Sequence, residues 1–373
     1  MNILHIITHY DPVIYGAENF AKHVAEYQAN KKENKVWVVT GKWRSQWKGD
    51  EIINGVNVVR VPCLNIRYIQ TILAVIPLYL KASEILKKQK IHRVHTHIYP
   101  GMIVGYLLHK RHKVPYIATI QGGDIGDYDE VFGAFKIVAK LLIGFCLKKA
   151  SKVHCVSNYL ANQVKKIGVD KNKILVIPNG VDTNKYQVSS IKYQEKKKDE
   201  IIRLVSTSRL EKKNNLTQLI DIIKQMNDKG YQSTLDIFGT GSLETTLINQ
   251  IRNLKLEKNV FLKSYIKQEL LSSILPNYDY FVRLSIGEGF GISFIEAMAC
   301  GVIPVALKSG GVVDIIDSNK NGFLLNSDNL EQEFETVIKS QNNNDILRKL
   351  AIEKVKSRFD WSIILPKLEI LYD

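Results

Sequence analysis

The sequence lacks an apolar segment long enough to cross a bilayer. Its longest apolar run, residues 68–80, falls short of the roughly 20 residues that a spanning helix needs, and Pro77 interrupts it. The start of the chain also lacks a charged leader with a cleavage site, and residues 1–8 have the pattern of a first strand rather than of a signal peptide. We therefore expect a cytoplasmic protein that is soluble or lies peripherally on the inner face of a membrane.

Cysteine is scarce too, and its placement argues against disulfides and metal sites. The four cysteines, Cys63, Cys146, Cys155 and Cys300, show neither paired spacing nor the spacing of metal ligands. This pattern indicates a reducing compartment, in which free cysteine behaves as a small apolar residue. Although the pI is near 9.4, the chain has no zinc motif, arginine-rich arm or basic strand interleaved with aromatic residues, so we expect no nucleic-acid partner.

Positive charge is abundant but unevenly distributed. The 373 residues exceed one ordinary domain and suit two, with a formal net charge of +15. The first 185 residues hold 27 Lys and Arg against 13 Asp and Glu, whereas the remainder hold 25 against 24. This asymmetry favours an anionic partner for the first half.

Short β-rich runs alternate with amphipathic helical segments in both halves, which predicts two doubly wound α/β domains built on parallel sheets. In the first half we expect helices such as 17–30 and 73–89, and strands at 3–8, 35–40, 56–61, 93–97, 116–121, 152–156 and 174–177. In the second half we expect helices at 216–229, 243–254, 267–275, 292–299 and 311–316, and strands at 202–206, 233–238, 260–262, 280–284, 303–306 and 322–325. The polar run 187–200 indicates the boundary, giving domains at 1–186 and 187–356.

The run 287–301 is the most informative segment, because it places two carboxylates eight positions apart around a glycine-rich turn. Gly289 and Gly291 allow a ligand to approach backbone amides, and the residues that follow have the pattern of a buried helix. Glu288 would lie in the loop and Glu296 about one turn into the helix. Carboxylates accept hydrogen bonds from hydroxyl pairs and a helix N-terminus accepts phosphate, so a polyhydroxylated ligand suits this layout.

The same run resembles the donor-site signature of the retaining glycosyltransferases of family 4, in which the two glutamates are followed by Ala297-Met298-Ala299 and then by Gly301. The resemblance extends along most of the chain. It implies the B-type glycosyltransferase fold, with two facing Rossmann-like domains, of which the C-terminal one binds a nucleotide-sugar and the N-terminal one binds the acceptor. It further implies a final helix that crosses back to the first domain, here over 357–373, and a reaction that needs neither a metal nor another cofactor.

The resemblance also implies residues that bind the donor. Arg209 and Lys213 would neutralise its diphosphate, although Asn214 stands where the family usually has lysine. Tyr15 likewise replaces the first glycine of the family's Gly-Gly turn. The donor-binding residues so implied are Gly16, Gly239, Gly241, Tyr265, Gly289, Phe290, Gly291, Ile292 and Glu296.

Three first-half residues would lie on the acceptor side, namely His95, His97 and Asp124. Two histidines on one face of a strand also suit a metal, but no third ligand is evident in the sequence, so we expect packing or acceptor contacts. Gln121 stands where the family typically has histidine. Its amide donates and accepts hydrogen bonds but cannot act as a general acid or base.

A retaining mechanism of this class requires charge stabilisation and positioning rather than a protein nucleophile, since the leaving diphosphate takes the acceptor's proton. The resemblance implies that Arg209 and Lys213 stabilise the diphosphate and that Glu296 holds the ribose hydroxyls. Glu288 would hold sugar hydroxyls together with the amides of residues 290–292. We therefore predict Glu288, Arg209, Lys213 and Gln121 as the catalytic residues.

Two first-half segments, 77–90 and 132–149, combine cations with apolar residues. Either suits the interface of an anionic membrane, where each cation near the surface contributes about 1 kcal/mol. The alternative is that their apolar faces cover the sheet and their lysines are solvated. The excess charge of the first half favours attraction to an anionic membrane surface.

Together these features predict a retaining, metal-independent hexosyl- or N-acetylhexosaminyltransferase. It would move a sugar from a nucleotide-sugar, with UDP-sugar favoured over GDP-sugar, to a glycan or polyprenyl-linked acceptor in cell-envelope polysaccharide synthesis. The alternatives are a non-catalytic scaffold of the same fold, because of the departures at Tyr15, Gln121 and Asn214, and a protein that binds nucleic acid or phosphate. The sequence does not predict an oligomeric state.

Overall fold

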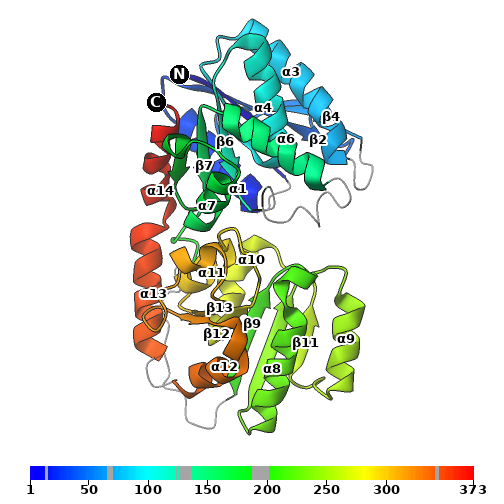
Figure 1. The fold of residues 1–373 in the computed structure, drawn as a ribbon, viewed down its shortest axis with the longest axis vertical. Coiled ribbons are helices and arrows are strands. Elements are labelled where there is room, and N and C mark those ends of the chain that lie inside the picture. The colour runs from blue at the N-terminus through cyan, green and yellow to red at the C-terminus, as the bar shows by residue number, and fades with distance from the viewer. Residues whose placement is uncertain (13–15, 65–69, 123–124, 126–135, 187–200, 341–343) are drawn as a thin grey trace. The chain divides into compact units, whose positions relative to one another are not determined.

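The computed structural model describes residues 1–12, 16–64, 70–122, 125, 136–186, 201–340 and 344–373, which form two compact units (Figure 1). Unit 1 comprises Met1–Asn179 and Ser362–Asp373, and unit 2 comprises Gly180–Trp361. The units thus divide at Asn179, whereas the sequence placed the division beside the run 187–200, which lies outside the described residues. The end of the chain returns to unit 1 as predicted, beginning at Ser362 rather than at residue 357.

The described residues of unit 1 form an eight-stranded sheet in the order β3-β4-β2-β1-β5-β6-β7-β8. Its strands are β1 Asn2–Ile6, β2 Lys35–Lys42, β3 Asp50–Ile53, β4 Val56–Pro62, β5 Arg93–His97, β6 Tyr116–Ile120, β7 Lys152–Cys155 and β8 Ile174–Val176. Neighbouring strands are parallel except at one edge, where β3 pairs antiparallel with β4. The expectation of a purely parallel sheet was therefore wrong at this edge. The turn residues Asn54 and Gly55 both adopt positive φ, the conformation that favours a tight hairpin.

Helices cover both faces of this sheet, and they are α1 Gly16–Ala29, α2 Gln70–Leu73, α3 Val75–Lys88, α4 Ile98–His112, α6 Lys136–Lys149 and α7 Asn158–Lys166. Figure 1 shows α3, α4 and α6 side by side on one face. On the opposite face Phe20 of α1 contacts the rings of His97 and His154, whereas Thr96, which alternates with the histidines of β5, points toward Gly105 of α4. This alternation is the two-residue period of a strand that is buried on both faces.

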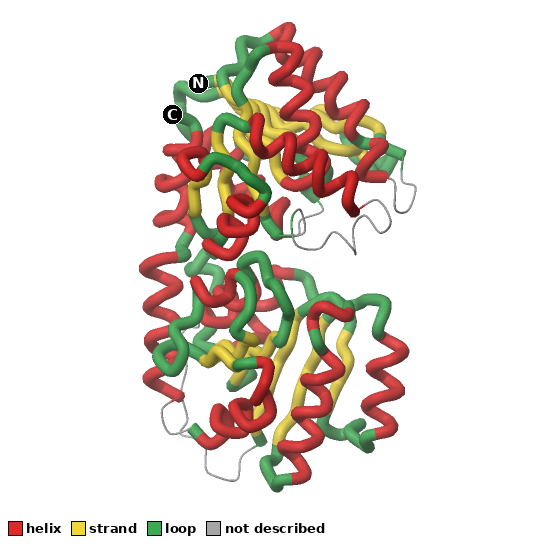
Figure 2. Tube along the Cα trace, in the orientation of Figure 1, coloured by secondary structure: helices red, strands yellow, loops and turns green. Residues whose placement is uncertain are grey.

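The described residues of unit 2 form a six-stranded parallel sheet in the order β11-β10-β9-β12-β13-β14 (Figure 2). Its strands are β9 Ile202–Thr207, β10 Ser233–Phe238, β11 Val260–Lys263, β12 Tyr280–Arg283, β13 Ile303–Leu307 and β14 Phe323–Leu325. The α-helices are α8 Leu216–Asp228, α9 Glu244–Asn253, α10 Gln268–Ile274, α11 Ile292–Ala299, α12 Leu330–Lys339, α13 Asn344–Arg358 and α14 Trp361–Lys367, which runs across the division into unit 1. The helix expected at 311–316 is instead a short 3₁₀ turn, Gly311–Asp314.

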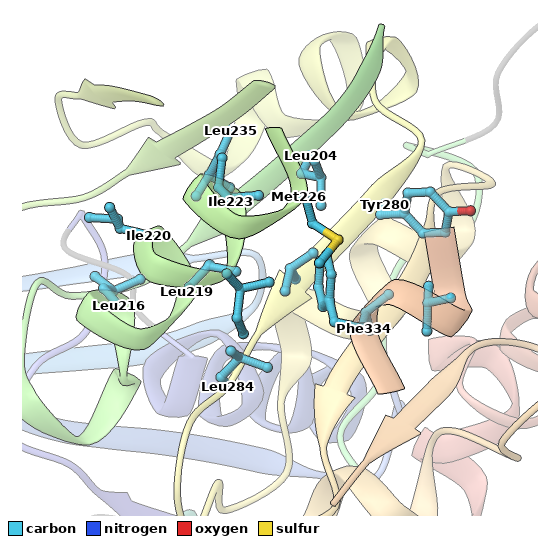
Figure 3. Close-up of a cluster of buried hydrophobic side chains, with 14 of the residues drawn as sticks. Leu204, Leu216, Leu219, Ile220, Ile223, Met226, Leu235, Tyr280, Leu284 and Phe334 are labelled. Carbon is cyan, nitrogen blue, oxygen red and sulfur yellow. The ribbon is translucent and has the colours of Figure 1, made fainter. Parts of the chain in front are cut away.

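Apolar packing against α8 forms the core of unit 2 (Figure 3). The buried side chains of α8 recur three or four positions apart, which places them on the helix face that meets the sheet. They meet leucines of β9 and β10 and an aromatic residue of α12, and the residues labelled in Figure 3 are Leu204, Leu216, Leu219, Ile220, Ile223, Met226, Leu235, Tyr280, Leu284 and Phe334. This core supports the strand ends from which the candidate site residues project. The predicted class of two Rossmann-like α/β domains is thus confirmed.

Candidate active site

Glu288 lies in the loop between β12 and α11 and is held there by an ion pair. The Nη2 atom of Arg283 lies 2.6 Å from Oε2 of Glu288, and the Nη1 atom donates to Oγ of Ser293 at 2.8 Å. The backbone is fixed as well, because the amide of Gly311 donates to the carbonyl oxygen of Glu288 at 2.6 Å. A side chain at Gly310 would collide with the Glu288 backbone, so that glycine permits the contact. The carboxylate is therefore oriented by a cation and remains partly exposed, at 21%.

The start of α11 presents backbone amides beside this carboxylate. Gly291 precedes the helix with a φ of 100°, and no side chain caps the helix start by a hydrogen bond. Phe290 is buried, with its ring centroid 5.8 Å from that of Phe359. Ile292 is the first helical residue. Since the first amides of a helix have no partner within it, this end suits hydroxyl or phosphate oxygens. The binding of a donor there stays a prediction.

Glu296 lies one turn into α11 and is 4% exposed. Its Oε1 atom accepts hydrogen bonds from Nε2 of Gln268 at 2.5 Å and from the hydroxyl of Tyr186 at 3.1 Å. Burial raises the pKa of this carboxyl to about 7, while the two hydrogen bonds and the charge of Arg283 act in the opposite direction. The two carboxylates thus have different environments, because Glu288 is paired with a cation and Glu296 is buried with neutral hydrogen-bond donors.

The loop after β9 carries Arg209 and Lys213. Hydrogen bonds from Ser242, followed by the charges of the two cations, hold the pKa of Glu211 below its usual value, so both cations act on that carboxylate. Asn214 is buried, and its amide donates to the carbonyl oxygen of Arg209 at 2.6 Å while it accepts from Oγ of Ser285 at 2.9 Å. Asn214, which stands where the family usually has lysine, therefore holds this loop in place through its hydrogen bonds.

Gly239 and Gly241 lie where this loop crosses the next one. A Cβ atom at Gly239 would collide with the carbonyl oxygen of Ser208, and one at Gly241 would collide with the backbone of Leu210. The amide of Leu210 donates to the carbonyl oxygen of Thr240 at 3.0 Å. Close backbone packing alone thus requires both glycines, whatever role they have toward a ligand. Tyr265, in the loop after β11, is 57% exposed.

Besides His95 and His97, two predicted site residues of unit 1 lie in the described part of the chain, Gly16 and Gln121. Gly16 is the exposed first residue of α1. Gln121 follows β6, and its Oε1 atom accepts a hydrogen bond from Nδ2 of Asn179 at 3.1 Å. Asp124 and Tyr15 lie outside the described residues.

His95 and His97 are fully buried and belong to a larger set of polar residues under α1 and the C-terminal segment. The ring of His154 donates from Nε2 to the carbonyl oxygen of Ile177 at 2.7 Å, so its Nδ1 accepts from the hydroxyl of Thr119 at 3.1 Å. That hydroxyl in turn accepts from Nε2 of His95 at 2.7 Å. The Nδ1 of His95 must then accept from Tyr372, whose hydroxyl lies at 2.6 Å. This chain of hydrogen bonds assigns a tautomer to the neutral rings of His154 and His95.

His5 is a further histidine of this region, and it was not among the site residues predicted from the sequence. Its Nδ1 lies 3.0 Å from Nε2 of His97, and strand pairing aligns it with His95. One ring nitrogen from each of His5, His95 and His97 lies within 4.8 Å of the others, which is close enough for a metal ion. Both nitrogens of His95 are already bonded, to Tyr372 and Thr119, so coordination would break one of those bonds. The predicted absence of a metal remains a prediction.

Burial keeps these imidazoles neutral. It lowers the pKa of His5 to about 3 and that of His154 to about 4, against the backbone hydrogen bond that His154 makes. Burial, followed by the neighbouring histidines, lowers the pKa values of His95 and His97 well below the usual value. The set therefore provides packing and hydrogen bonds at neutral pH rather than positive charge.

Two family models cover almost the whole chain. Residues 187–358 match the glycosyl transferases group 1, and residues 14–185 match glycosyltransferase family 4. The chain belongs to the group 1 glycosyltransferases. The predicted family and enzyme class are thereby confirmed, and the two-unit architecture of this glycosyltransferase is the GT-B fold.

Relatives of this glycosyltransferase are distant in sequence and close in fold. It is 26% identical over 324 residues to an Escherichia coli UDP-Gal:α-D-GlcNAc-diphosphoundecaprenol α-1,3-galactosyltransferase, covering 83% of this chain and 81% of that one. Sucrose-phosphate synthase from Thermosynechococcus elongatus superposes with a TM-score of 0.83 at 20% identity, covering 100% and 98%. The Anabaena protein HepE in complex with UDP and glucose gives a TM-score of 0.78 at 19% identity, covering 99% and 98%.

Several contacts of the glycosyltransferase site were not predicted from the sequence. Arg283, which pairs with Glu288, is the last residue of a buried strand, and nothing in the local pattern distinguishes it. Tyr186 and Gln268 meet Glu296 from positions 110 and 28 residues away in sequence. For His5 a signal was present, since it occupies the first strand as His95 occupies its neighbour.

Proposed function

We propose that this glycosyltransferase retains the anomeric configuration of its donor and transfers a sugar from a UDP-sugar to a lipid-linked glycan in cell-envelope polysaccharide synthesis. The observation that carries the proposal is the arrangement around α11. A carboxylate oriented by Arg283, an uncapped helix start and a second carboxylate one turn later lie within nine residues. No nearby side chain in this arrangement is needed as a nucleophile.

Each part of the arrangement suits one part of a nucleotide-sugar. Glu288 would accept hydrogen bonds from sugar hydroxyls, and its pairing with Arg283 keeps the carboxylate in place before the sugar arrives. Glu296 would accept the ribose hydroxyls in exchange for one of its present donors, Tyr186 or Gln268. The amides at Phe290, Gly291 and Ile292 would face the sugar or the phosphate.

The cationic loop would stabilise the leaving diphosphate. Arg209 and Lys213 both act electrostatically on Glu211, and the Asn214 amide donates a hydrogen bond to the carbonyl oxygen of Arg209. Charge that develops on the departing UDP would be met by these two side chains, so the proton of the acceptor hydroxyl passes to the diphosphate. Gln121 would contribute hydrogen bonds to the sugar without carrying a proton.

The choice of donor and acceptor rests on the relatives. HepE is described in complex with UDP and glucose, and the E. coli relative is named for UDP-Gal and a diphosphoundecaprenol-linked sugar. A UDP-sugar donor and a polyprenyl-linked acceptor are thus the first candidates for this chain. An acceptor of that kind lies in a membrane, which is why we also propose a peripheral position on its inner face.

Replacing Glu288 by alanine tests the proposal. We expect UDP-sugars, but not GDP- or ADP-sugars, to raise the melting temperature of the wild type. We expect Glu288→Ala to reduce the release of UDP in the presence of a polyprenyl-diphosphate-linked sugar by at least about 100-fold, because a contact made to the transition state is lost. Glu257→Ala, a change at an exposed carboxylate of the same unit, is the matched control. Full activity of the folded Glu288→Ala protein, or a product of inverted anomeric configuration by NMR, would refute the proposal.

A further inference from the structure

Helix α6 is apolar on the side that faces away from the protein. Its inner side buries Ala139, Ile143, Cys146 and Leu147 against unit 1. Its outer side carries five large apolar residues with exposed fractions from 40% to 70%, which are Ile137, Val138, Leu141, Leu142 and Phe145. A helix that is apolar all round is normally buried, and a contiguous exposed apolar surface marks an interaction site.

A groove of about 370 Å³ lies between α6 and the end of α7. Its lining includes the apolar side chains of Leu141, Phe145 and Ile167. A Cβ atom at Gly144 would clash with Ile167, so that glycine allows α6 and the residue after α7 to approach. Three lysines, Lys140, Lys148 and Lys166, line the same groove. Apolar side chains and lysines therefore line the same groove.

Among the described residues that line this groove, the charged side chains are all lysines. Neither α6 nor α7 contains an aspartate or a glutamate, and Lys149 and Lys165 add to the three lysines of the groove. Helix α3, the other basic and apolar segment that the sequence indicated, differs in this respect. Glu84 of α3 forms ion pairs with Lys81 at 3.1 Å and with Lys88 at 2.7 Å, so part of the positive charge of α3 is balanced within the helix.

We propose that the outer side of α6, with the lysine-lined groove beside α7, is the surface by which unit 1 binds an anionic phospholipid bilayer. The apolar side chains would enter the boundary between headgroups and acyl chains, and the lysines would meet lipid phosphates. Lysine is depleted in protein–protein interfaces, so a lysine-rich border around apolar residues favours a membrane over a protein partner. The helices of the part of the chain that the structure describes include no candidate for spanning a membrane, and the binding would be peripheral.

This membrane-binding role rests on the proposed function, because binding to the bilayer would bring the enzyme to a lipid-linked acceptor. The surface differs from the donor site in location and in chemistry. The two ideas can therefore fail separately, provided that membrane binding is measured without a nucleotide-sugar and UDP binding without a membrane.

Co-sedimentation with vesicles tests the surface. We expect the full-length protein to sediment with vesicles that contain phosphatidylglycerol and to remain in solution with pure phosphatidylcholine, with binding that weakens as salt is raised. Leu141→Glu combined with Phe145→Glu should reduce binding at least tenfold. Lys140→Glu, Lys148→Glu and Lys166→Glu together should do the same. All five side chains are exposed, so the variants should fold, and an unchanged thermal shift with UDP checks this.

Matched controls distinguish an effect of this surface from an effect of net charge or of exposed apolar residues in general. Lys258→Glu, Lys320→Glu and Lys356→Glu change the net charge equally on unit 2. Ile52→Glu with Ile346→Glu alters exposed apolar residues elsewhere, and both controls should retain binding. Equal binding to neutral and anionic vesicles, or equal losses in the α6 variants and the controls, would overturn the proposal. So would a dimer in analytical ultracentrifugation that the α6 variants dissociate, without vesicle binding by the wild type, because the surface would then join two copies.

Discussion

The imidazoles buried in unit 1 and the carboxyl of Glu296 buried in unit 2 shift their pKa values in opposite directions. Unit 1 encloses His5, His95, His97 and His154, while unit 2 encloses Glu296. Burial lowers the pKa values of the histidines and raises the pKa of the glutamate, so the neutral form is favoured in each unit. The comparison shows that one physical effect, the cost of burying charge, gives the two halves of one chain opposite responses to pH.

The signs follow from linkage between folding and protonation. A histidine whose pKa is depressed on folding contributes stability above the unfolded value of 6.5 and loses it as pH falls toward the folded value. A carboxyl whose pKa is raised contributes stability that is complete below the unfolded value of 4.5 and is lost as pH rises through the folded value of about 7. A fall of pH below about 6.5 therefore destabilises unit 1, and a rise of pH from about 4.5 to about 7 destabilises this part of unit 2.

The largest expected effect is the acid response of unit 1. If the unfolded chain binds four more protons than the folded one, stability falls by about 5 kcal/mol per pH unit below the ordinary histidine pKa. His5→Phe should make this slope shallower by about 1.4 kcal/mol per pH unit, because one titrating ring is removed and an apolar ring takes its place. Urea denaturation at a series of pH values, with each unit followed by hydrogen exchange of its own peptides, measures the slope. An unchanged slope in His5→Phe would show that His5 is not part of the response.

The next effect is the loss of unit 2 stability as pH rises from about 4.5 to about 7. Glu296→Gln keeps an acceptor for Gln268 and Tyr186 but cannot ionise, so the stability of unit 2 should no longer fall between pH 4.5 and 7. The wild type should lose about 3 kcal/mol over this interval. The same denaturation series measures it, and each variant serves as the control for the other unit. A pH-dependent loss in unit 2 that persists in Glu296→Gln would contradict the assignment.

The smallest effect concerns the hydrogen bond that joins the C-terminal segment to the histidines. Tyr372→Phe removes the donor to Nδ1 of His95 and leaves a buried acceptor unsatisfied, at a cost of about 1–3 kcal/mol to unit 1. Tyr27→Phe is a matched control, since the Tyr27 hydroxyl donates at 2.6 Å to Glu369 of the same segment in a more exposed position. We expect it to change stability by less than about 1 kcal/mol. Equal effects of the two changes in urea denaturation would argue against the buried bond as the main anchor.

Elements that a local pattern specifies could be predicted from the sequence, whereas contacts that depend on the folded sheet could not. The alternating pattern predicted strands such as β5 and β10 with their observed bounds, and the run around Glu288 predicted α11, because these signals are local. The strand β3 escaped notice, although Asn54-Gly55 is a hairpin signal. The partners of the two glutamates were beyond reach, since Arg283, Tyr186 and Gln268 approach them only after the sheet of unit 2 has formed.

The family resemblance supplied what local patterns could not. It implied that the end of the chain returns to the first domain, and Ser362–Asp373 belongs to unit 1. It also drew attention to Asn214 as a departure, and the structure shows a buried amide that braces the loop instead of a cation. Whether Lys213 replaces the missing charge depends on a bound diphosphate, which no pattern in one sequence can represent.

The return of the C-terminal segment has a consequence for synthesis on the ribosome. Unit 1 takes its last twelve residues, Ser362–Asp373, from the far end of the chain. At translation rates of about 5–20 residues per second, roughly 10 to 40 seconds separate the emergence of Asn179 from that of Ser362. Throughout that interval the nascent first half lacks the tyrosine that completes its histidine network, and chaperones have their longest access to that uncovered face.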